Sequence, residues 1–202
     1  AATVRGYFET IAPRYDLVNS LLSGGLHHRW RRQAIRAARI TRGERVLDAC
    51  GGTGDLGLAA AARTGSAGLV CVYDFSRAML ARARVKQSGA RRVQVVCGDA
   101  QALALRDRSF DVALIGFGLR NLQDMRQGLR ELHRVLACGG RLVCLEFSRP
   151  RSVWLRVLYD IYSFYVIPWV GDRFGRCREA YRYLPDSIRR FPLPERLAEL
   201  LR

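Results

Sequence analysis

The sequence lacks the features that mark a metalloprotein, a secreted protein or a membrane-spanning protein. Its six cysteines show no CxxC or other metal-ligand spacing, and most lie in apolar runs. We therefore expect reduced thiols that pack as small apolar groups in an intracellular protein. No signal peptide is visible at the start. The longest apolar stretch, 153–170, carries Arg156 and Asp160, which makes it a poor membrane span.

Lysine is nearly absent too. Lys86 is the single lysine, so arginine supplies almost all of a net charge of +16. Such a charge favours anionic partners, whether nucleic acid, an acidic lipid surface or a phosphorylated substrate, and does not choose among them. No internal repeat is present in the 202 residues, and a 49% hydrophobic content suits one domain with a full core.

Short apolar runs alternate with segments of helical character. We expect helices at 4–18, 26–39, 55–63, 76–87 and 124–136, and strands at 45–50, 68–74, 92–99, 110–118 and 141–147. The paired Gly139 and Gly140 should end the last helix. This alternation predicts an α/β fold: a Rossmann-like, doubly wound, mainly parallel sheet with helices on both faces. Ligands of such sheets bind at the carboxyl ends of the strands.

The stretch VLDACGGTGD (46–55) places three glycines between two aspartates at a strand-to-helix junction. GTGDLG (52–57) matches the GxGxxG fingerprint of dinucleotide sites, and Asp74 follows twenty residues after Gly54. An acid at the end of a second strand accepts hydrogen bonds from the ribose of any nucleoside ligand. No GK[ST] follows the glycines, which excludes a phosphate-binding loop of that type.

The residues around the glycines favour S-adenosylmethionine over NAD. A chain of 202 residues offers no second domain for a hydride acceptor. Asp48 precedes Gly52 and would repel a pyrophosphate, whereas it suits a ligand with adenosine at one end and sulfonium and ammonium groups at the other. Asp99 follows the third strand, where it and the Ala100 amide could contact adenine.

Four spaced motifs then resemble one family. The glycine segment, VYD, GDA and SFDVALI are similar to class I S-adenosylmethionine-dependent methyltransferases. YDLVNSLLSGGLHHRW (15–30), RVLACGGRLVCLEFS (134–148), GFGLRN (116–121) and YRYLPDSIR (181–189) resemble the quinol C-methyltransferases of menaquinone and ubiquinone biosynthesis. By position, the resemblance implies Thr53, Asp74, Asp99, Ala100 and the Gly116 backbone as cofactor-binding residues. Asp48 and Gly52 join them on physical grounds.

The resemblance also bears on the domain organisation. We expect a single methyltransferase domain over 1–202: a helical, substrate-side cap (1–40), a cofactor-binding core (45–148) and an aromatic-rich helical lid (151–202). Members of the family normally continue into final antiparallel strands, which we expect to be missing here, leaving an exposed sheet edge. Gly116 stands where many members have a serine that contacts the cofactor, so that hydrogen bond is in question.

The reaction implied by the resemblance is methyl transfer to a ring carbon of a polyprenyl quinol, either demethylmenaquinol or the benzoquinol precursor of ubiquinol. The sulfonium methyl is already activated, so no metal is expected, but a phenolic proton must be removed or polarised. The candidate catalytic residues are Arg120, Asn121, His27 and Tyr15. Each also has an ordinary reading, as a surface ion pair, a helix cap or a polar helix face.

A lipid-borne acceptor gives the positive charge a role. Arginines at 29, 31, 32, 36, 39 and 42 could rest on anionic headgroups, or could form a solvated face. We expect a cytoplasmic enzyme with peripheral contact at the inner membrane face, forming a homodimer and binding no nucleic acid. The alternatives are a methyltransferase for another small molecule or for nucleic acid, and a cofactor-binding protein without activity. GFGLRN replaces the blocks common in base-flipping methyltransferases.

Overall fold

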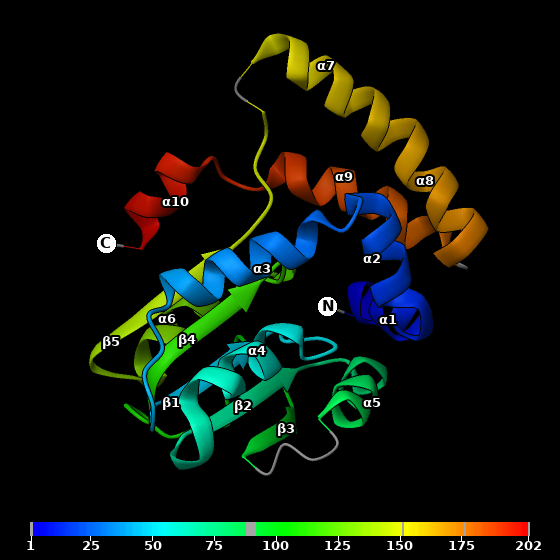
Figure 1. The fold of residues 1–202 in the computed structure, drawn as a ribbon. Helices are drawn as coiled ribbons and strands as arrows, with labels where there is room; N and C mark the ends of the chain where they lie inside the picture. Colours follow the sequence, from blue (N-terminus) through cyan, green and yellow to red (C-terminus); the bar gives the residue numbers. More distant parts are fainter. Residues whose placement is uncertain (1, 88–91, 151, 176, 202) are drawn as a thin grey trace.

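The computed structural model describes residues 2–87, 92–150, 152–175 and 177–201. Its centre is a five-stranded sheet in the order β3-β2-β1-β4-β5 (Figure 1). The strands are β1 (Arg45–Ala49), β2 (Leu69–Asp74), β3 (Val93–Cys97), β4 (Phe110–Gly116) and β5 (Leu136–Leu145). All pairings between described strands are parallel. In this strand order, β3 and β5 form the two edges. This confirms the predicted Rossmann-like, doubly wound fold, with its switch point between β1 and β4.

Helices cover both faces of the sheet because alternate strand residues point to opposite sides. Val46, Val72 and Leu114 pack against one layer, which consists of α3 (Leu26–Ala37), α4 (Asp55–Thr64) and α5 (Arg77–Lys86). Leu47, Tyr73 and Ile115 pack against the other, which consists of α6 (Met125–Val135) and α10 (Pro194–Leu200). Ser76 caps α5, since its side chain accepts a hydrogen bond from the Met79 amide.

The N-terminal segment is broken where one helix was predicted over 4–18. The chain forms α1 (Ala2–Ile11), a 3₁₀ turn (Ala12–Arg14) and α2 (Tyr15–Ser23). Pro13 lies in that turn, where its ring and missing N–H group oppose a continuous α-helix. The following helix begins at Leu26 as expected, but it ends at Ala37.

The region around the paired glycines also differs from prediction. Helix α6 ends at Val135, and β5 begins at once with Leu136, so the glycines lie inside the strand instead of stopping a helix. Gly139 has φ +77, and the pairing with β4 jumps from Phe110–Leu136 to Val112–Arg141. The extra residues form a bulge, which glycine accommodates without strain.

A third layer lies above the carboxyl ends of the strands (Figure 1). It combines α1 and α2 with α7 (Val153–Ile161), a π-helical turn (Tyr162–Val166), α8 (Ile167–Val170), a second π-helical turn (Gly171–Gly175) and α9 (Arg178–Arg190). Val18, Ile167 and Tyr181 belong to one buried apolar cluster that joins the two ends of the chain. Segments about 150 residues apart in sequence therefore enclose the same space.

The six cysteines are free thiols. Their burial is less complete than the sequence suggested, because Cys71 is buried whereas Cys97 and Cys138 are exposed. Exposed thiols contribute little to the core, so the expectation of six buried, structural cysteines is wrong for these two.

Gly57 provides a test of how tightly α4 packs on the sheet. A Cβ atom there would lie 2.6 Å from Val72 Cγ2 and 3.0 Å from Asp48 Oδ2. We expect Gly57→Ala to lower the free energy of unfolding by about 1–3 kcal/mol, measured by urea denaturation. Gly6→Ala in α1, where nothing lies within 4 Å, should instead raise it by about 0.5–1 kcal/mol. Equal effects at the two positions would contradict this packing.

Candidate functional site

The turn after β1 wraps around the carboxylate of Asp48. Cys50, Gly52 and Gly54 all have positive φ, at +52, +54 and +82, before α4 begins at Asp55. Asp48 is 1% exposed, and its Oδ2 accepts a hydrogen bond from the Gly57 amide at 2.7 Å. A Cβ on Gly51 would approach this oxygen to 2.8 Å. The glycines thus let the backbone close over a buried carboxylate.

The second carboxylate oxygen of Asp48, Oδ1, is buried and has no hydrogen-bond partner among the described residues. Burial raises the pKa of Asp48 to about 7, although the Gly57 amide acts in the opposite direction. A buried acceptor without a partner, beneath a glycine turn, is suited to a cationic ligand, which would restore the ionised form.

Asp74, at the end of β2, fixes the other side of the turn. Its carboxylate accepts hydrogen bonds from the Gly52 amide at 2.9 Å and from the Ser76 amide at 2.8 Å. Burial raises the pKa of Asp74 to about 6, against the effect of these amides. The acid predicted to hold a ribose therefore also holds the glycine turn in place.

A small cavity of about 50 Å³ lies beside this turn. Asp74, Asp99, Ala100 and Asn121 are among its lining residues. Asp99 lies just after β3, where its Oδ1 accepts a hydrogen bond from the Gln101 amide at 2.9 Å. Asp74, Asp99 and Ala100, three of the predicted cofactor residues, thus line the same cavity.

Gly116, the last residue of β4, has a steric reason to be glycine. A Cβ atom there would lie 2.4 Å from Leu56 Cδ1, and Leu56 belongs to α4. The Leu56 side chain occupies the space that a serine side chain would need. Any ligand contact at this position must therefore come from the backbone.

Thr53 belongs to a charged network that the sequence did not reveal. Its hydroxyl donates to Asp16 Oδ1 at 2.8 Å, and Lys86 Nζ donates to the Thr53 oxygen at 2.9 Å. Lys86 also lies 2.8 Å from Asp16 Oδ2 and 2.6 Å from Asp55 Oδ1. Burial would raise the pKa of Asp16, but hydrogen bonds from Lys86 and Thr53 outweigh it and lower that pKa.

This network extends to α3, because Arg31 Nη1 lies 2.9 Å from Asp55 Oδ2. Its members come from α2, α3, α4 and α5. It therefore ties the N-terminal helices directly to the glycine turn. The signals available in the sequence were the single lysine and an acid beside Tyr15, but neither indicates a partner by itself.

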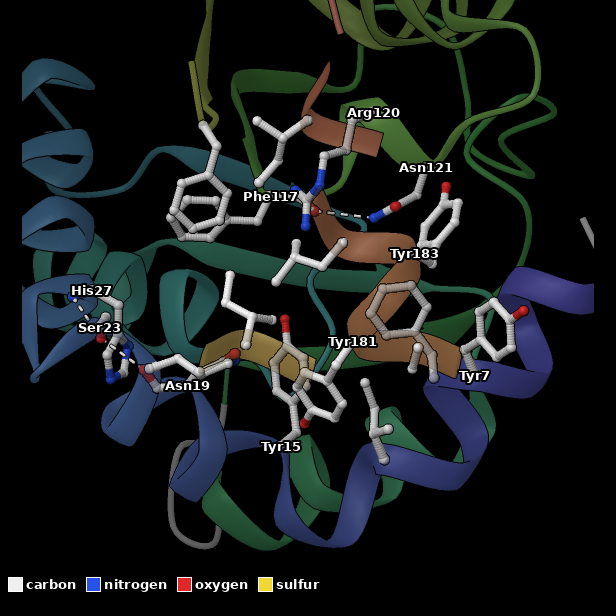
Figure 2. Close-up of a pocket in the computed structure, with 18 of the residues that line it drawn as sticks. Tyr7, Tyr15, Asn19, Ser23, His27, Phe117, Arg120, Asn121, Tyr181 and Tyr183 are labelled. Carbon is white, nitrogen blue, oxygen red and sulfur yellow. Dashed lines mark hydrogen bonds between the residues drawn. The ribbon is translucent and has the colours of Figure 1, made fainter. Parts of the chain in front are cut away.

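A larger, apolar cavity of about 240 Å³ lies beneath the third layer (Figure 2). Its walls come from α1, α2, α3, α7, α9 and the segments that follow β4 and β5. The rings of Trp30, Phe117 and Phe147 form one side, with Phe117 stacked on Phe147 at a centroid distance of 4.6 Å. All four predicted catalytic residues, Tyr15, His27, Arg120 and Asn121, line this cavity.

Arg120 is held by a residue that was missed, Glu146. Arg120 Nη1 lies 2.8 Å from Glu146 Oε2, and the two side chains are only 7% and 4% exposed. Glu146 follows the end of β5, and no motif in the sequence pairs it with Arg120. The Nε of Arg120 and the Oδ1 of Asn121 are buried without hydrogen-bond partners among the described residues. One donor and one acceptor of residues that line this cavity thus lack partners within the described part of the protein.

His27 is arranged differently. Arg31 donates to its Nδ1, and its Nε2 lies 3.0 Å from Ser20 Oγ. Because arginine can only donate, Nδ1 holds the lone pair and Nε2 carries the proton. Burial and the charges of Arg31 and His28 lower the pKa of His27 to about 4. Its lone pair is therefore engaged inside the protein. Tyr15 is half-buried, and desolvation of its hydroxyl raises the pKa of that group.

Asn121 lines both the small cavity and the apolar cavity. It lies in the 3₁₀ turn after β4 (Leu119–Asn121), where its Nδ2 donates to the Phe117 carbonyl at 3.1 Å. The small cavity and the apolar cavity therefore share a lining residue in the turn that follows β4. Among the described residues, no group of three His, Cys, Asp or Glu side chains could hold a metal ion.

A model of the ubiE/COQ5 methyltransferase family matches residues 1–202. The chain belongs to the ubiE/COQ5 family. It is 43% identical to a protein of Paraburkholderia phymatum named ubiquinone/menaquinone biosynthesis C-methyltransferase UbiE, over 100% of this chain and 83% of that one. A protein of the same name from Methylobacterium nodulans is 45% identical over 98% and 80% of the two chains. The chain is thus an S-adenosylmethionine-dependent methyltransferase of the ubiquinone/menaquinone type.

Solved structures agree with the fold. A methyltransferase from Aquifex aeolicus superimposes with a TM-score of 0.57 at 20% identity, over 72% of this chain and 78% of that one. The [4+2]-cyclase SpnF superimposes with a TM-score of 0.61 at 23% identity, over 72% and 59%. Because the cyclase catalyses a different kind of reaction, these structural similarities show the fold alone.

The buried Asp48 should make stability depend on pH. A carboxyl whose pKa is raised by folding weakens the native state as pH rises from the unfolded pKa of about 3.9 toward the folded value. We expect the free energy of unfolding to fall between about pH 4.5 and about pH 7.5, and to fall less in Asp48→Asn, which keeps an acceptor for Gly57. The exposed Asp186→Asn is the control. Identical pH slopes for all three proteins would contradict the assigned burial.

Lys86 offers a test of the network. Lys86→Met should leave Asp16 and Asp55 close together without a cation between them, and we expect S-adenosylmethionine to bind about tenfold more weakly or worse. Lys86→Arg should recover much of the loss, and Arg84→Met, at an exposed position of the same helix, should have no effect. Calorimetric titration gives the dissociation constants. Unchanged affinity in Lys86→Met would argue against a link between Thr53 and the ligand.

Proposed function

We propose that this chain transfers a methyl group from S-adenosylmethionine to a ring carbon of a polyprenyl quinol, demethylmenaquinol or the benzoquinol precursor of ubiquinol. The family and the names of its relatives support the reaction type. The observation that carries the proposal is the Arg120–Asn121 wall, a buried donor and a buried acceptor without partners, set in an aromatic cavity. That combination matches an apolar ring with hydroxyl groups.

The residues around the turn fit S-adenosylmethionine. The buried Asp48 Oδ1 lacks a partner and would favour its cationic end, and Asp74 and Asp99 line the small cavity as acceptors for a nucleoside. We assign Ala100 and Gly116 to backbone contacts, Gly52 to the turn and Thr53 to the link with α2. When bound, S-adenosylmethionine supplies an activated methyl group. The protein's part is to hold the acceptor carbon about 3–3.5 Å from it, in line.

Arg120 is assigned the role of stabilising the quinol as a phenolate. Its guanidinium remains protonated, so it acts as a fixed cation and not as a base. A cation beside the ring oxygen lowers the pKa of the phenol, whose proton passes to water, and the resulting negative charge makes the ortho carbon nucleophilic. As that carbon bonds the methyl group, the C–S bond of S-adenosylmethionine breaks to leave the neutral thioether, and loss of the ring proton to water restores the aromatic quinol. Asn121 Oδ1 would accept from a quinol hydroxyl and orient the ring. The hydroxyl of Tyr15 stays protonated and serves as a donor.

His27 is assigned to positioning instead of proton transfer. Its lone pair faces Arg31, which in turn contacts Asp55 of the network. The apolar lining of the larger cavity also speaks against a nucleic acid acceptor, since a flipped base is read mainly through hydrogen bonds to its polar edge. A different small phenol remains the main alternative acceptor. Cytoplasmic location and a homodimer stay predictions.

A side-by-side assay tests the proposal. The protein should methylate demethylmenaquinol or its benzoquinol counterpart with labelled S-adenosylmethionine. Arg120→Met should lower kcat about 10²–10³-fold, because a preorganised charge at the developing oxyanion is removed. Its affinity for S-adenosylmethionine should not change, since Arg120 does not line the small cavity.

Arg130→Met, on the exposed face of α6, is the matched control and should behave as the parent protein. Retained kcat in Arg120→Met would overturn the role of Arg120. Tight binding of S-adenosylmethionine without transfer to either quinol would overturn the acceptor class.

A further inference from the structure

The segment from α7 to α8 exposes an unusual amount of apolar surface. Of the sixteen exposed large hydrophobic side chains in the described part of the chain, ten lie between Val153 and Trp169. Trp154 is 82% exposed, Tyr165 73% and Trp169 63%. A patch of this density on one segment marks an interaction surface and not scattered surface hydrophobics.

The first part of helix α7 is exposed on all sides. Every residue from Val153 to Leu158 is exposed, and Arg156 is the one charged residue among them. Six consecutive helical residues cover more than one full turn, so no face of this part of the helix packs on the protein. Figure 1 shows α7 at the outer limit of the molecule. Lipid can surround such a helix on all sides, whereas a docked protein with a flat surface would cover only one side of it.

The next part of the segment faces the apolar cavity. Tyr159, Tyr162 and Ile167 line it, whereas Ile161, Phe164 and Tyr165 on the same stretch are exposed. This stretch therefore separates the cavity from the surface by the thickness of one helix. The Tyr162 hydroxyl donates to the Leu22 carbonyl, which joins the segment to the end of α2. A long apolar substituent could pass from this surface into the cavity.

The charges near the segment favour an anionic partner. Arg149, Arg156 and Arg173 are exposed together with a single exposed acid among the described residues of 149–173, Asp172, whereas Asp160 is paired with Arg189 at 2.5 Å. The chain carries a net charge of +16, so two copies repel each other and an anionic leaflet attracts both. No helix among the described residues is long and apolar enough to cross a membrane. The segment is thus suited to lie in a membrane surface.

We propose that the α7–α8 segment docks into the boundary between headgroups and acyl chains of an anionic bilayer. Its tryptophans and Tyr165 would lie at the level where amphipathic rings are enriched, with arginines toward the headgroups. Docking would place the cavity wall next to the lipid phase, from which a polyprenyl quinol enters. This last step rests on the proposed function, but docking itself does not.

Vesicle binding tests the proposal on the full chain. Vesicles of phosphatidylcholine containing phosphatidylglycerol should bind the protein, and those of phosphatidylcholine alone should bind it less. The double variant Trp154→Glu/Leu158→Glu should bind anionic vesicles at least about tenfold more weakly, since two exposed apolar groups are lost and two negative charges added. Val85→Glu/Leu193→Glu, exposed apolar positions outside the segment, is the control for charge. Equal binding by both double variants would overturn the proposal.

Two further readouts separate the outcomes. With a soluble, tail-free quinol the Trp154→Glu/Leu158→Glu variant should keep its kcat, and with quinol in vesicles it should lose activity in proportion to binding. Absence of transfer to either quinol, with vesicle binding intact, would count against the proposed function alone. A lipid-free dimer that the double variant converts to monomer, with vesicle binding unchanged, would show that a second copy covers this surface and would overturn docking.

Discussion

The hydrogen bond between the buried Asp48 carboxylate and the Gly57 amide is the contact on which the rest of the site depends. It joins the end of β1 to the first turn of α4, and the backbone between them can close only because glycine occupies the crowded positions. The same turn receives Asp74 through the Gly52 amide. Two carboxylates with raised pKa values therefore hold one loop between them.

The charged network of Asp16, Lys86, Asp55 and Arg31 connects this loop to the helices around the apolar cavity. Thr53 takes part on the loop side, and His27 on the cavity side. Opposite charges alternate along it, so each carboxylate has a cation within 3 Å. Such a partly buried network is sensitive to loss of one member, because the remaining charge is left unpaired. The network thereby links the position of the N-terminal helices α2 and α3 to the shape of the glycine turn.

The two cavities divide the chemistry between them. Polar acceptors gather beside the glycine turn, and aromatic rings gather beneath the third layer, with Asn121 on both walls. Glu146 fixes the Arg120 guanidinium at this boundary, and the low exposure of both side chains strengthens their interaction. Asn121 thus lies where the proposed acceptor ring would meet the methyl donor.

Local sequence determined much of this protein. Alternating apolar runs gave the parallel sheet, and glycines next to Asp48 located the ligand turn, since both signals arise from neighbours along the chain. The motif resemblance pointed to Tyr15, His27, Arg120 and Asn121, which meet at one cavity. The break at Pro13 was a local signal that the prediction over 4–18 overlooked. The sequence did not determine the bulge at Gly139, the Arg120–Glu146 pair or the role of Lys86. These were decided by tertiary structure, because each depends on contacts between segments far apart in the chain, and residue type alone carries no information about such partners.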